Sequence, residues 1–469
     1  MRRPRRPREV PVAPGGRRRA AGALAVALLA TTTACAGPDD DALVVWTLEN
    51  LPDRLAAQQE ILDAWSAGSG VDVRLVGVAE DQFNQLLLTS AAAGDLPDVV
   101  GALPLAGVRA LAAADLVDTE VAGTLVEDLG EETFTPRALE LTREGDEQLA
   151  VPSDGWAQLL VYRRDLFEAE GLAPPDTYEA MVAAARALDG PDLAGFTGAS
   201  VAGDSFTQQS FEHVALGNGC QLVDADGTVT LDDPRCVEAF TTYGELVRDL
   251  SVPGSQDVDT TRATYFAGGA AMLLWSSFVL DEMAGLRDDA LPSCPECLED
   301  PRFLADVSGV VTAVRGPDGE EAAQFGEVVS WAVTPTARPE AADLVAHMMG
   351  EGYEPWLGFA PEGKVPVRLG TPEEPTRYLD AWATLPAGVD TRVPLADVYP
   401  PEVLDALVAG TAAARPWGIE QGQGALVGAT LGEQPVAAAV AAVASGELTP
   451  AEAAAQAAED VRDIQRSLR

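Results

Sequence analysis

Apolar and polar residues follow two different periods along the chain, and the two kinds of segment succeed one another repeatedly. Leu43–Thr47 is a continuous apolar run of strand length, and residues 54–67 place apolar side chains at helical spacing. Residues 71–78 alternate like a second strand, residues 83–93 are again helical, and residues 97–100 begin a third strand. Strands that alternate with helices predict an α/β fold with a largely parallel sheet.

The same alternation returns from residue 159 onward and changes character near the C-terminus. From residue 400 to the end, the pattern predicts a mostly helical segment with breaks at 416–424 and 446–450. Between these regions we expect helices at 177–188, 206–217, 234–250 and 339–349, strands at 307–314 and 328–333, and a loop at 286–301.

The N-terminus has the three parts of an export signal. Residues 1–19 are basic, residues 20–30 are apolar, and small residues precede Cys35. This order predicts a secretory signal peptide over residues 1–34, and its apolar run is too short to span a bilayer. Thr-Thr-Ala before Cys35 is similar to a bacterial lipobox, which implies a lipidated Cys35, a tether over 35–41 and a location outside the cytoplasm on the cell membrane. The alternative is an ordinary cleaved signal, with Cys35 as a spare thiol.

Composition then excludes some kinds of partner. The chain has 47% hydrophobic and 22% charged residues, which is typical of a globular protein. Its net charge is −43, and the chain without residues 1–34 has 23 basic and 73 acidic residues, a net charge of −50. Such a surface repels nucleic-acid phosphates, so we expect no nucleic-acid partner.

Four cysteines follow Cys35, and an even number in an exported chain predicts two disulfides. Cys220 and Cys236 flank a turn signal that brings the chain back on itself. Cys294 and Cys297 have the spacing of a redox dithiol or of half a zinc site. They lie in a Pro-rich loop without a second such pair, so a structural disulfide is our prediction.

Several segments together resemble the bacterial extracellular solute-binding proteins of the maltose-binding type. The similar segments occur in the family's order along most of the chain: LVVWTLEN (43–50), GDLPDVV (94–100), LLVYRRDLFEAEGLAPPDTYEAMVAAARAL (159–188), TYFAGGAAMLLWSSF (264–278), WAVTPTARPEAADLVAHMM (331–349), GKVPVR (363–368) and SGELTPAEAAAQAAEDV (445–461).

This resemblance implies a two-lobed periplasmic-binding-protein fold of type II, in which each lobe is a mainly parallel sheet flanked by helices and a hinge joins the lobes. One lobe would comprise residues 42–152 and 325–360, and the other residues 156–310 and 366–469. A ligand would lie in the cleft between them, and hinge closure would follow its binding.

The resemblance also implies which residues hold the ligand. Glu49 and Asn50 follow the first strand, where the family contacts its ligand; their alternative role is to cap the helix that begins near Pro52. Asp154 and Trp156 lie at the first crossing between lobes, where a carboxylate and an aromatic ring suit the hydroxyls and the C–H face of a sugar.

Three further tryptophans complete the set of candidates. Trp275 lies where the resemblance places a cleft loop, Trp331 lies near the second crossing, and Trp417 lies in a Gly-rich loop. Packing in the core is the alternative role for each of these side chains.

These residues favour a binding protein over an enzyme. The expected function is delivery of a small solute of the sugar class to ABC permease subunits by a monomer, without cofactor or metal. The alternatives are a ligand-binding sensor or scaffold without transport, and a binder of a non-sugar solute. A remote alternative is a secreted hydrolase built on GDSF (203–206); the chain has only two histidines, and neither is preceded by an acid at the spacing that such a site requires.

Overall fold

Residues 42–468 are described by the computed structural model, with the side chains of Glu80, Asp81 and Asn84 excepted. The predicted signal peptide (1–34), Cys35 and the tether (35–41) lie outside the described residues.

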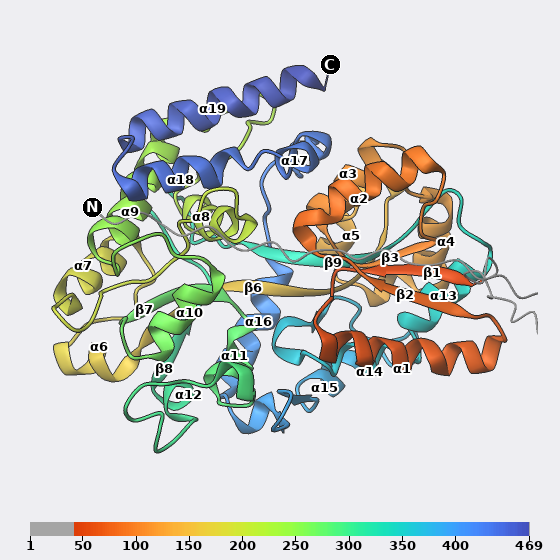
Figure 1. Cartoon of the computed structure of the whole chain (residues 1–469), viewed down its shortest axis with the longest axis horizontal. Helices are drawn as coiled ribbons and strands as arrows, with labels where there is room; N and C mark the ends of the chain where they lie inside the picture. The colour runs from red at the N-terminus through yellow and green to blue at the C-terminus, as the bar shows by residue number, and fades with distance from the viewer. Residues whose placement is uncertain (1–41, 469) are drawn as a thin grey trace, which may run out of the picture. The chain divides into compact units, whose positions relative to one another are not determined.

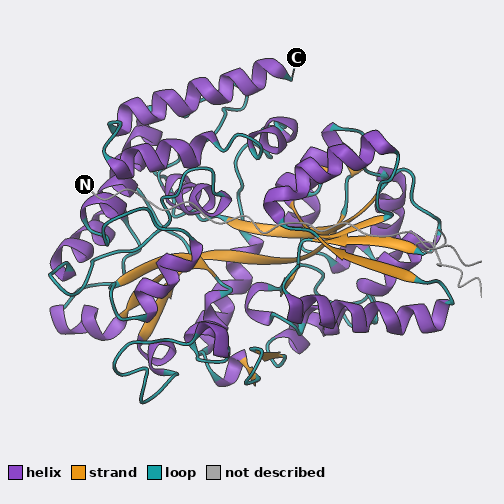
Figure 2. Cartoon of the chain, in the orientation of Figure 1, coloured by secondary structure: helices purple, strands orange, loops and turns teal. Residues whose placement is uncertain are grey.

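The elements alternate in the order that the hydrophobic pattern predicts (Figure 2). The strands are β1 (Leu43–Thr47), β2 (Val73–Gly77), β3 (Val99–Pro104), β4 (Arg143–Glu144), β5 (Glu147–Gln148), β6 (Val151–Arg163), β7 (Met272–Ser276), β8 (Ser308–Val311), β9 (Gly326–Val333), β10 (Val365–Pro366), β11 (Pro386–Ala387) and β12 (Val393–Pro394). The α-helices are α1 (Pro52–Ser69), α2 (Glu80–Ala93), α3 (Leu105–Ala113), α4 (Thr119–Leu129), α5 (Pro136–Leu141), α6 (Arg164–Glu170), α7 (Tyr178–Leu188), α8 (Ser205–Gly217), α9 (Pro234–Asp249), α10 (Val258–Phe266), α11 (Val279–Met283), α12 (Phe303–Val307), α13 (Glu340–Met348), α14 (Tyr353–Leu357), α15 (Arg377–Trp382), α16 (Pro401–Ala412), α17 (Gly424–Thr430), α18 (Pro435–Ser445) and α19 (Pro450–Ser467). Short 3-10 turns lie at Glu131–Thr133, Asp288–Ala290, Pro361–Gly363 and Leu395–Asp397.

The main sheet has the strand order β10-β6-β9-β3-β1-β2. The strand β1 pairs in parallel with β2 and with β3, because α1 and α2 return the chain to the same edge each time. The next pairs along the sheet, β3 with β9 and β9 with β6, are antiparallel.

The long strand β6 joins two sets of strands. Its first half pairs with β9 and β10, and its second half pairs with β7 and β8. The pairing changes between Ala157, which lies opposite Gly326 of β9, and Gln158, which lies opposite Ser276 of β7. We call the part around β1, β2, β3 and β9 the β1 side, and the part around β7 and β8 the β7 side.

The core of the β1 side lies on both faces of its sheet, because alternate side chains of a strand point to opposite faces. Leu43 and Val45 of β1 pack with α1, α13 and α14 on one face. Trp46 packs with residues of α2 and α3 on the other face. Figure 1 shows these two sets of helices above and below the sheet.

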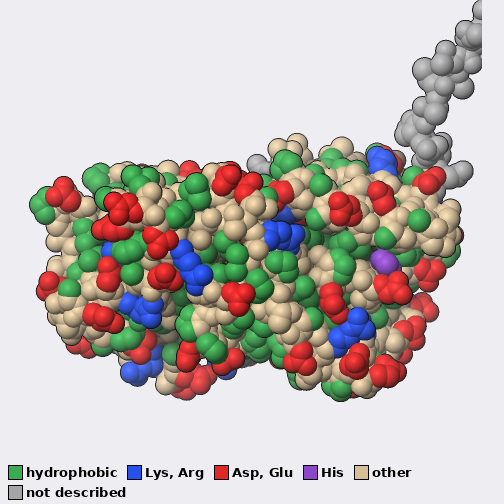
Figure 3. All heavy atoms as spheres, turned by 90° about the horizontal axis from the view of Figure 1, so that it is seen from below, with side chains coloured by type: hydrophobic (Ala, Val, Ile, Leu, Met, Phe, Trp, Pro, Cys, Tyr) green, Lys and Arg blue, Asp and Glu red, His purple; other side chains and the backbone are tan. Residues whose placement is uncertain are grey.

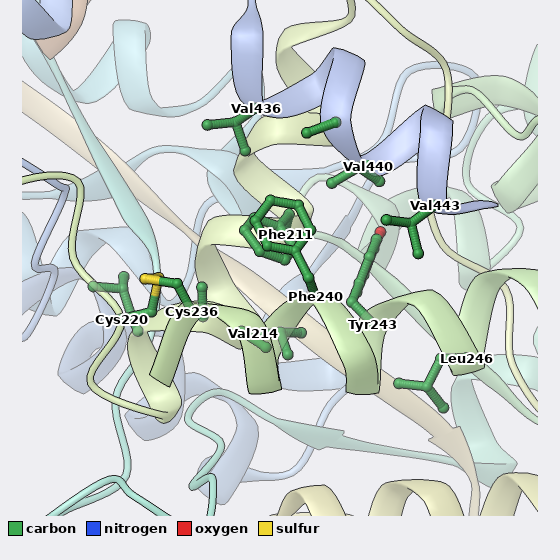
Figure 4. Close-up of a cluster of buried hydrophobic side chains, with 14 of the residues drawn as sticks. Phe211, Val214, Cys220, Cys236, Phe240, Tyr243, Leu246, Val436, Val440 and Val443 are labelled. Atoms are coloured by element: carbon green, nitrogen blue, oxygen red, sulfur yellow. A yellow bond between two sulfur atoms is a disulfide. The ribbon is translucent and has the colours of Figure 1, made fainter. Parts of the chain in front are cut away.

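The β7 side repeats this arrangement around the second half of β6. Leu160 and Tyr162 face a core built from α7, α8, α9, α18 and α19, and Leu159 and Val161 face a core built from α10, α11 and α16. In the first core, Phe211 of α8 stacks on Phe240 of α9 with ring centroids 4.2 Å apart, next to the Cys220–Cys236 disulfide (Figure 4).

The two sides also meet through α3 and α17 (Figure 1). A Cβ atom added at Gly428 of α17 would lie 2.8 Å from the backbone nitrogen of Ala110 in α3, and one added at Gly424 would lie 2.6 Å from the Arg109 side chain. Glycine at these positions therefore allows the two helices to approach closely.

The predicted elements are confirmed, and one feature of the predicted sheet is wrong. Each strand and helix expected from the sequence is present, with ends that differ by a few residues. The sheets were expected to be mainly parallel, but among the named strands that the structure describes, parallel pairing joins β1 only to β2 and β3. The difference arises because β6 runs antiparallel to β9 and β10 along its first half and antiparallel to β7 and β8 along its second half.

Both predicted disulfides are present, Cys220–Cys236 and Cys294–Cys297. Of the helices in the described range, none is by itself long and apolar enough to cross a membrane; α17 and α18 pass that test only when taken as a pair, bent by 51°.

The disulfides lead to a stability prediction. A cross-link that closes a longer loop removes more entropy from the unfolded chain, so the bridge across 16 residues contributes about 3 kcal/mol and the bridge across 3 residues about 2 kcal/mol. We expect Cys220→Ala/Cys236→Ala to lower the free energy of unfolding more than Cys294→Ala/Cys297→Ala. Urea unfolding without reductant measures both, and the two pairs are matched controls because all four side chains are buried. Equal losses, or the reverse order, would contradict this assignment.

Candidate functional site

Two adjoining cavities lie where the β1 side meets the β7 side. The larger has a volume of about 760 Å³ and the smaller about 230 Å³. Both are lined by Leu48, Pro104, Gln209 and Glu327, so they form one continuous site.

The larger cavity takes its lining from both sides of the fold. The β1 side contributes residues of α2 and the start of α3, including Phe83 and Leu105. The β7 side contributes the start of α8, Phe325, and the segment around Trp417 that leads into α17. Gly203, Asp204 and Ser205 of the GDSF segment belong to this lining, and Phe206 lines the smaller cavity. The Asp204 carboxylate accepts a hydrogen bond from the Phe206 backbone N–H at the beginning of α8.

The smaller cavity has a charged wall whose members pair with one another. Lys364 lies 2.7 Å from the Glu49 carboxylate and 3.4 Å from the Asp154 carboxylate. Arg54 of α1 contacts the other oxygen of Glu49 at 2.6 Å. The indole N–H of Trp356 donates a hydrogen bond to Asp154 at 2.6 Å, and the Lys364 ammonium lies 4.1 Å from the centre of the Trp356 ring.

Burial and pairing act on these carboxylates in opposite senses. Burial raises the pKa of Glu49, but the charges of Arg54 and Lys364 outweigh it and lower that pKa to about 2. Burial raises the pKa of Asp154, and Lys364 opposes the rise only in part. Glu49 is therefore the ionised partner of Lys364 over the whole neutral range.

The larger cavity holds a second pair of acids. Glu212 of α8 and Glu327 of β9 both line it, and their residues are 4% and 7% exposed. Burial, together with the nearby charge of Glu327, raises the pKa of Glu212 to about 8, and the hydrogen bond from the Trp417 backbone N–H opposes this rise.

Three of the sequence-predicted residues meet in the smaller cavity. Glu49, Asp154 and Trp156 all line it, and Trp156 packs edge-on against Phe325 with ring centroids 5.7 Å apart. Neither Glu49 nor Asn50 caps α1, whose N-cap is Leu51 followed by Pro52. Trp417 lines the larger cavity, and its indole N–H donates to the Cys220 carbonyl.

The other three residues predicted to bind the ligand, Asn50, Trp275 and Trp331, line neither of these two cavities. Asn50 donates a hydrogen bond to the Val78 carbonyl, and Trp275 donates one to the Val258 carbonyl. Trp331 is 1% exposed and packs against Trp356 in the core of the β1 side. Trp275 and Trp331 are buried in the core, which is the alternative role that the sequence offered for these tryptophans.

Sequence reasoning missed the residues that complete the charged wall. Arg54 and Lys364 come from segments far apart in the chain, and only the fold brings them to Glu49. Lys364 is the only lysine in the sequence, and this rarity was the one available signal. No sequence pattern distinguished Glu212 and Glu327 as site residues among the 74 acidic residues of the chain.

Comparison with known proteins gives consistent results. Residues 49–289 match the family described as bacterial extracellular solute-binding protein. The Escherichia coli (strain K12) protein YcjN, whose name describes it as an ABC transporter periplasmic-binding protein, is 26% identical over 306 residues. That alignment covers 64% of this chain and 66% of YcjN, just under two thirds of that protein. A Deinococcus radiodurans protein named as an ABC transporter-binding protein is 23% identical over 309 residues, which are 61% of this chain and 67% of that protein.

Solved structures share the fold. The GacH receptor of Streptomyces glaucescens, studied unliganded and with acarbose, has a TM-score of 0.67 at 20% identity and covers 90% of this chain and 97% of its own. Maltose-bound MalE3 of T. maritima has a TM-score of 0.68 at 17% identity, and the match covers 90% of this chain and 99% of MalE3. A sugar transporter of Arthrobacter chlorophenolicus with bound laminaribiose has a TM-score of 0.66 at 19% identity, and the match covers 90% of this chain and 99% of that protein.

The charged wall leads to a stability prediction. Lys364→Met leaves the buried Asp154 carboxylate without a cation and Glu49 with Arg54 alone, so we expect a loss of about 3–5 kcal/mol in the free energy of unfolding. Urea unfolding at neutral pH measures it. Arg415→Met is the control, because its pair with Glu321 is exposed and contributes about 1 kcal/mol or less. A loss no larger than that of the control would contradict the role of Lys364.

Glu212 leads to a prediction on pH. Its pKa is about 8 in the folded protein and near 4.5 in the unfolded chain, so the folded state holds the proton more tightly. The stability that this provides is present below about pH 4.5 and is lost as the pH rises through about 8. We expect the free energy of unfolding to fall over this range less steeply in Glu212→Gln, whose amide oxygen can still accept the Trp417 N–H. Urea unfolding at a series of pH values compares the two, and parallel curves would contradict the shift.

Proposed function

Because the chain belongs to the bacterial extracellular solute-binding protein family, we propose that it captures a small solute of the carbohydrate class and presents it to an ABC importer. The observation on which this rests is the cavity of about 760 Å³, which residues of both sides of the fold line together. Its volume is within the usual range of small-molecule sites. A ligand there contacts both sides at once, so its binding energy favours the arrangement in which they are close.

The lining supports the choice of a carbohydrate. Trp417, Phe325 and Phe83 offer aromatic surface for the C–H face of a sugar ring, and Gln208 and Gln209 offer amide groups for its hydroxyls. The fold neighbours were solved with acarbose, maltose and laminaribiose, which is the same class of ligand.

We assign different roles to the predicted site residues. Trp156 and Trp417 are the aromatic contacts of the ligand. Glu49 and Asp154 are bound to Lys364, so they hold the walls of the smaller cavity in place as positioning residues. In this proposal Asn50, Trp275 and Trp331 stabilise the elements around the site without touching the ligand.

The lobes and the hinge are part of the same proposal. One lobe comprises residues 42–152 and 325–360, and the other residues 156–310 and 366–469, with the hinge where β6, β9 and β10 cross. In this proposal the lobes separate when the site is empty and close on the ligand, and the permease subunits recognise the closed form.

The protein acts outside the cytoplasm and is a carrier without catalytic activity in this proposal. The predicted signal peptide supports export, and the predicted acylation of Cys35 would hold the protein at the cell membrane beside its permease. A sensor without transport would bind the same ligand, so uptake of that ligand by cells with and without the gene distinguishes the two.

Ligand screening tests the proposed class. We expect one or a few mono- or disaccharides to raise the unfolding temperature of the protein from residue 36 onward, because a ligand of the folded state alone stabilises it by about 2.7 kcal/mol at a hundred times its dissociation constant. Differential scanning fluorimetry with saccharides, polyols, amino acids and short peptides measures the shift. A shift with amino acids or peptides and none with saccharides would contradict the carbohydrate class.

Trp156→Ala tests the site within the same experiment. Since Trp156 lines the smaller cavity and is only partly buried, the variant should fold and should bind the identified saccharide at least tenfold more weakly. Equal affinity in the folded variant would remove Trp156 from the site.

A further inference from the structure

Aliphatic side chains from both sides of the fold line the larger cavity. The β1 side and the β7 side contribute three each of its larger members: Leu48, Leu88 and Leu105, and Val201, Ile419 and Val427. Among the described lining residues there is no Arg, Lys or His. Figure 3 shows, by contrast, that acidic and basic side chains are scattered together over one outer face. The cavity wall therefore differs in chemistry from the outer surface.

Three of the four acids in this lining are bonded to backbone N–H groups of the protein. The Asp204 carboxylate caps the beginning of α8, as described above. Glu212 accepts a hydrogen bond from the Trp417 N–H at 2.7 Å, and Glu327 accepts one from the Leu105 N–H at 2.9 Å. Since burial raises the pKa of Glu212 to about 8, that carboxyl holds its proton at neutral pH. These acids therefore hold the wall of the cavity together.

Two of the uncharged polar side chains are also used within the wall. Thr430 donates a hydrogen bond to the Val427 carbonyl at 2.7 Å, and the Gln434 amide donates one to the Leu431 carbonyl at 3.2 Å. The other uncharged polar residues with long or hydroxyl side chains are Gln85, Ser205, Gln208 and Gln209, of which only Gln209 also lines the smaller cavity. The larger cavity thus offers few polar groups to a ligand for its volume of about 760 Å³.

The smaller cavity has the opposite character. Its charged wall consists of Glu49, Arg54, Asp154 and Lys364, and its aromatic rings are those of Trp156, Phe206 and Phe278. Its volume of about 230 Å³ lies below the range of about 300–1,000 Å³ that is usual for sites of drug-sized molecules. It is therefore suited to a single sugar ring, whose hydroxyls meet the charged wall and whose C–H face meets an aromatic ring.

The aliphatic wall decides between a second sugar ring and an apolar group in the larger cavity. Aromatic rings suit either of them, but aliphatic side chains form no hydrogen bonds, so hydroxyls placed against Leu105 or Ile419 would lose their bonds to water without replacement. An apolar group in the same place removes aliphatic surface from water, which is favourable. Leu88 has much to gain, because 63% of its surface is exposed.

We propose that the natural ligand is an amphipathic glycoside, whose sugar ring lies in the smaller cavity and whose apolar aglycone, an alkyl or aryl group, fills the larger cavity. One molecule reaches both places, because the two cavities share Leu48, Pro104, Gln209 and Glu327 in their lining. This inference rests on the proposed function and narrows its substrate class.

Matched glycosides test the aglycone directly, without a variant. Methyl and phenyl β-D-glucopyranoside have the same sugar and differ only in the aglycone, and cellobiose has a second sugar ring in its place. Methyl and phenyl β-D-galactopyranoside and lactose form the same set for galactose. Isothermal titration calorimetry with the wild-type protein should show, in at least one set, at least tenfold tighter binding of the phenyl glycoside than of the methyl glycoside and of the disaccharide. A disaccharide that binds as tightly as the phenyl glycoside or more tightly, or a phenyl glycoside no better than the methyl glycoside, would overturn the apolar aglycone and leave the carbohydrate function intact.

Phenol, the aglycone without its sugar, separates the failure of this inference from the failure of the proposed function. Phenol that binds as tightly as the phenyl glycosides, with no response to the methyl glycosides and the disaccharides, would overturn the carbohydrate function together with the glycoside. No binding of any of these probes, by a protein whose unfolding curve shows that it is folded, would overturn the glycoside as stated. The saccharide panel described above then decides the proposed function by itself.

Two variants locate the aglycone. Leu88→Gln should weaken binding of the phenyl glycoside at least fivefold and leave the methyl glycoside within twofold, because it removes apolar surface from the larger cavity alone. Val201→Thr, which exchanges a methyl group for a hydroxyl, should act in the same direction if Leu88→Gln does not fold. Leu86→Gln is the matched control, since Leu86 lies on the same helix, is 37% exposed and lines neither cavity. An unchanged preference for the phenyl glycoside in folded Leu88→Gln and Val201→Thr would overturn the placement.

Discussion

The strand β6 is the constraint on which the arrangement of the fold depends. Its 13 residues pair with β9 and β10 at one end and with β7 and β8 at the other. Because side chains alternate along it, a shift of one residue would turn Leu159 and Val161 out of one core and Leu160 and Tyr162 out of the other. Asp154 and Trp156 therefore reach the cavity at a fixed register, close to the point where the pairing changes.

The site separates two electrostatic tasks. In the smaller cavity, charges from β6, from the ends of β1 and β10 and from α1 neutralise one another, so this part binds the elements of the protein together. In the larger cavity, the Trp417 backbone N–H orients Glu212, and burial raises the pKa of that carboxyl to about 8.

The sequence was sufficient for the elements and for the fold class, which the similarity to solved structures confirms as a periplasmic-binding-protein fold of type II. Local hydrophobic period determines an element such as α9, and the family's motif order determines the fold. Parallel or antiparallel pairing depends on the paths of β6 and β9, which no local pattern encodes. The same limit applies to Lys364, whose partners are more than 200 residues away, and to Trp331, since an aromatic side chain suits a core as well as a cleft.

The single lysine has a further chemical consequence. Reagents that acylate amines find one lysine side chain in this sequence, and the fold buries its nitrogen between two carboxylates. An ammonium group in that position is a poor nucleophile, because acylation requires the free amine and access for the reagent. The rate at which Lys364 is acylated is therefore a direct chemical measure of how often the charged wall of the smaller cavity opens to solvent.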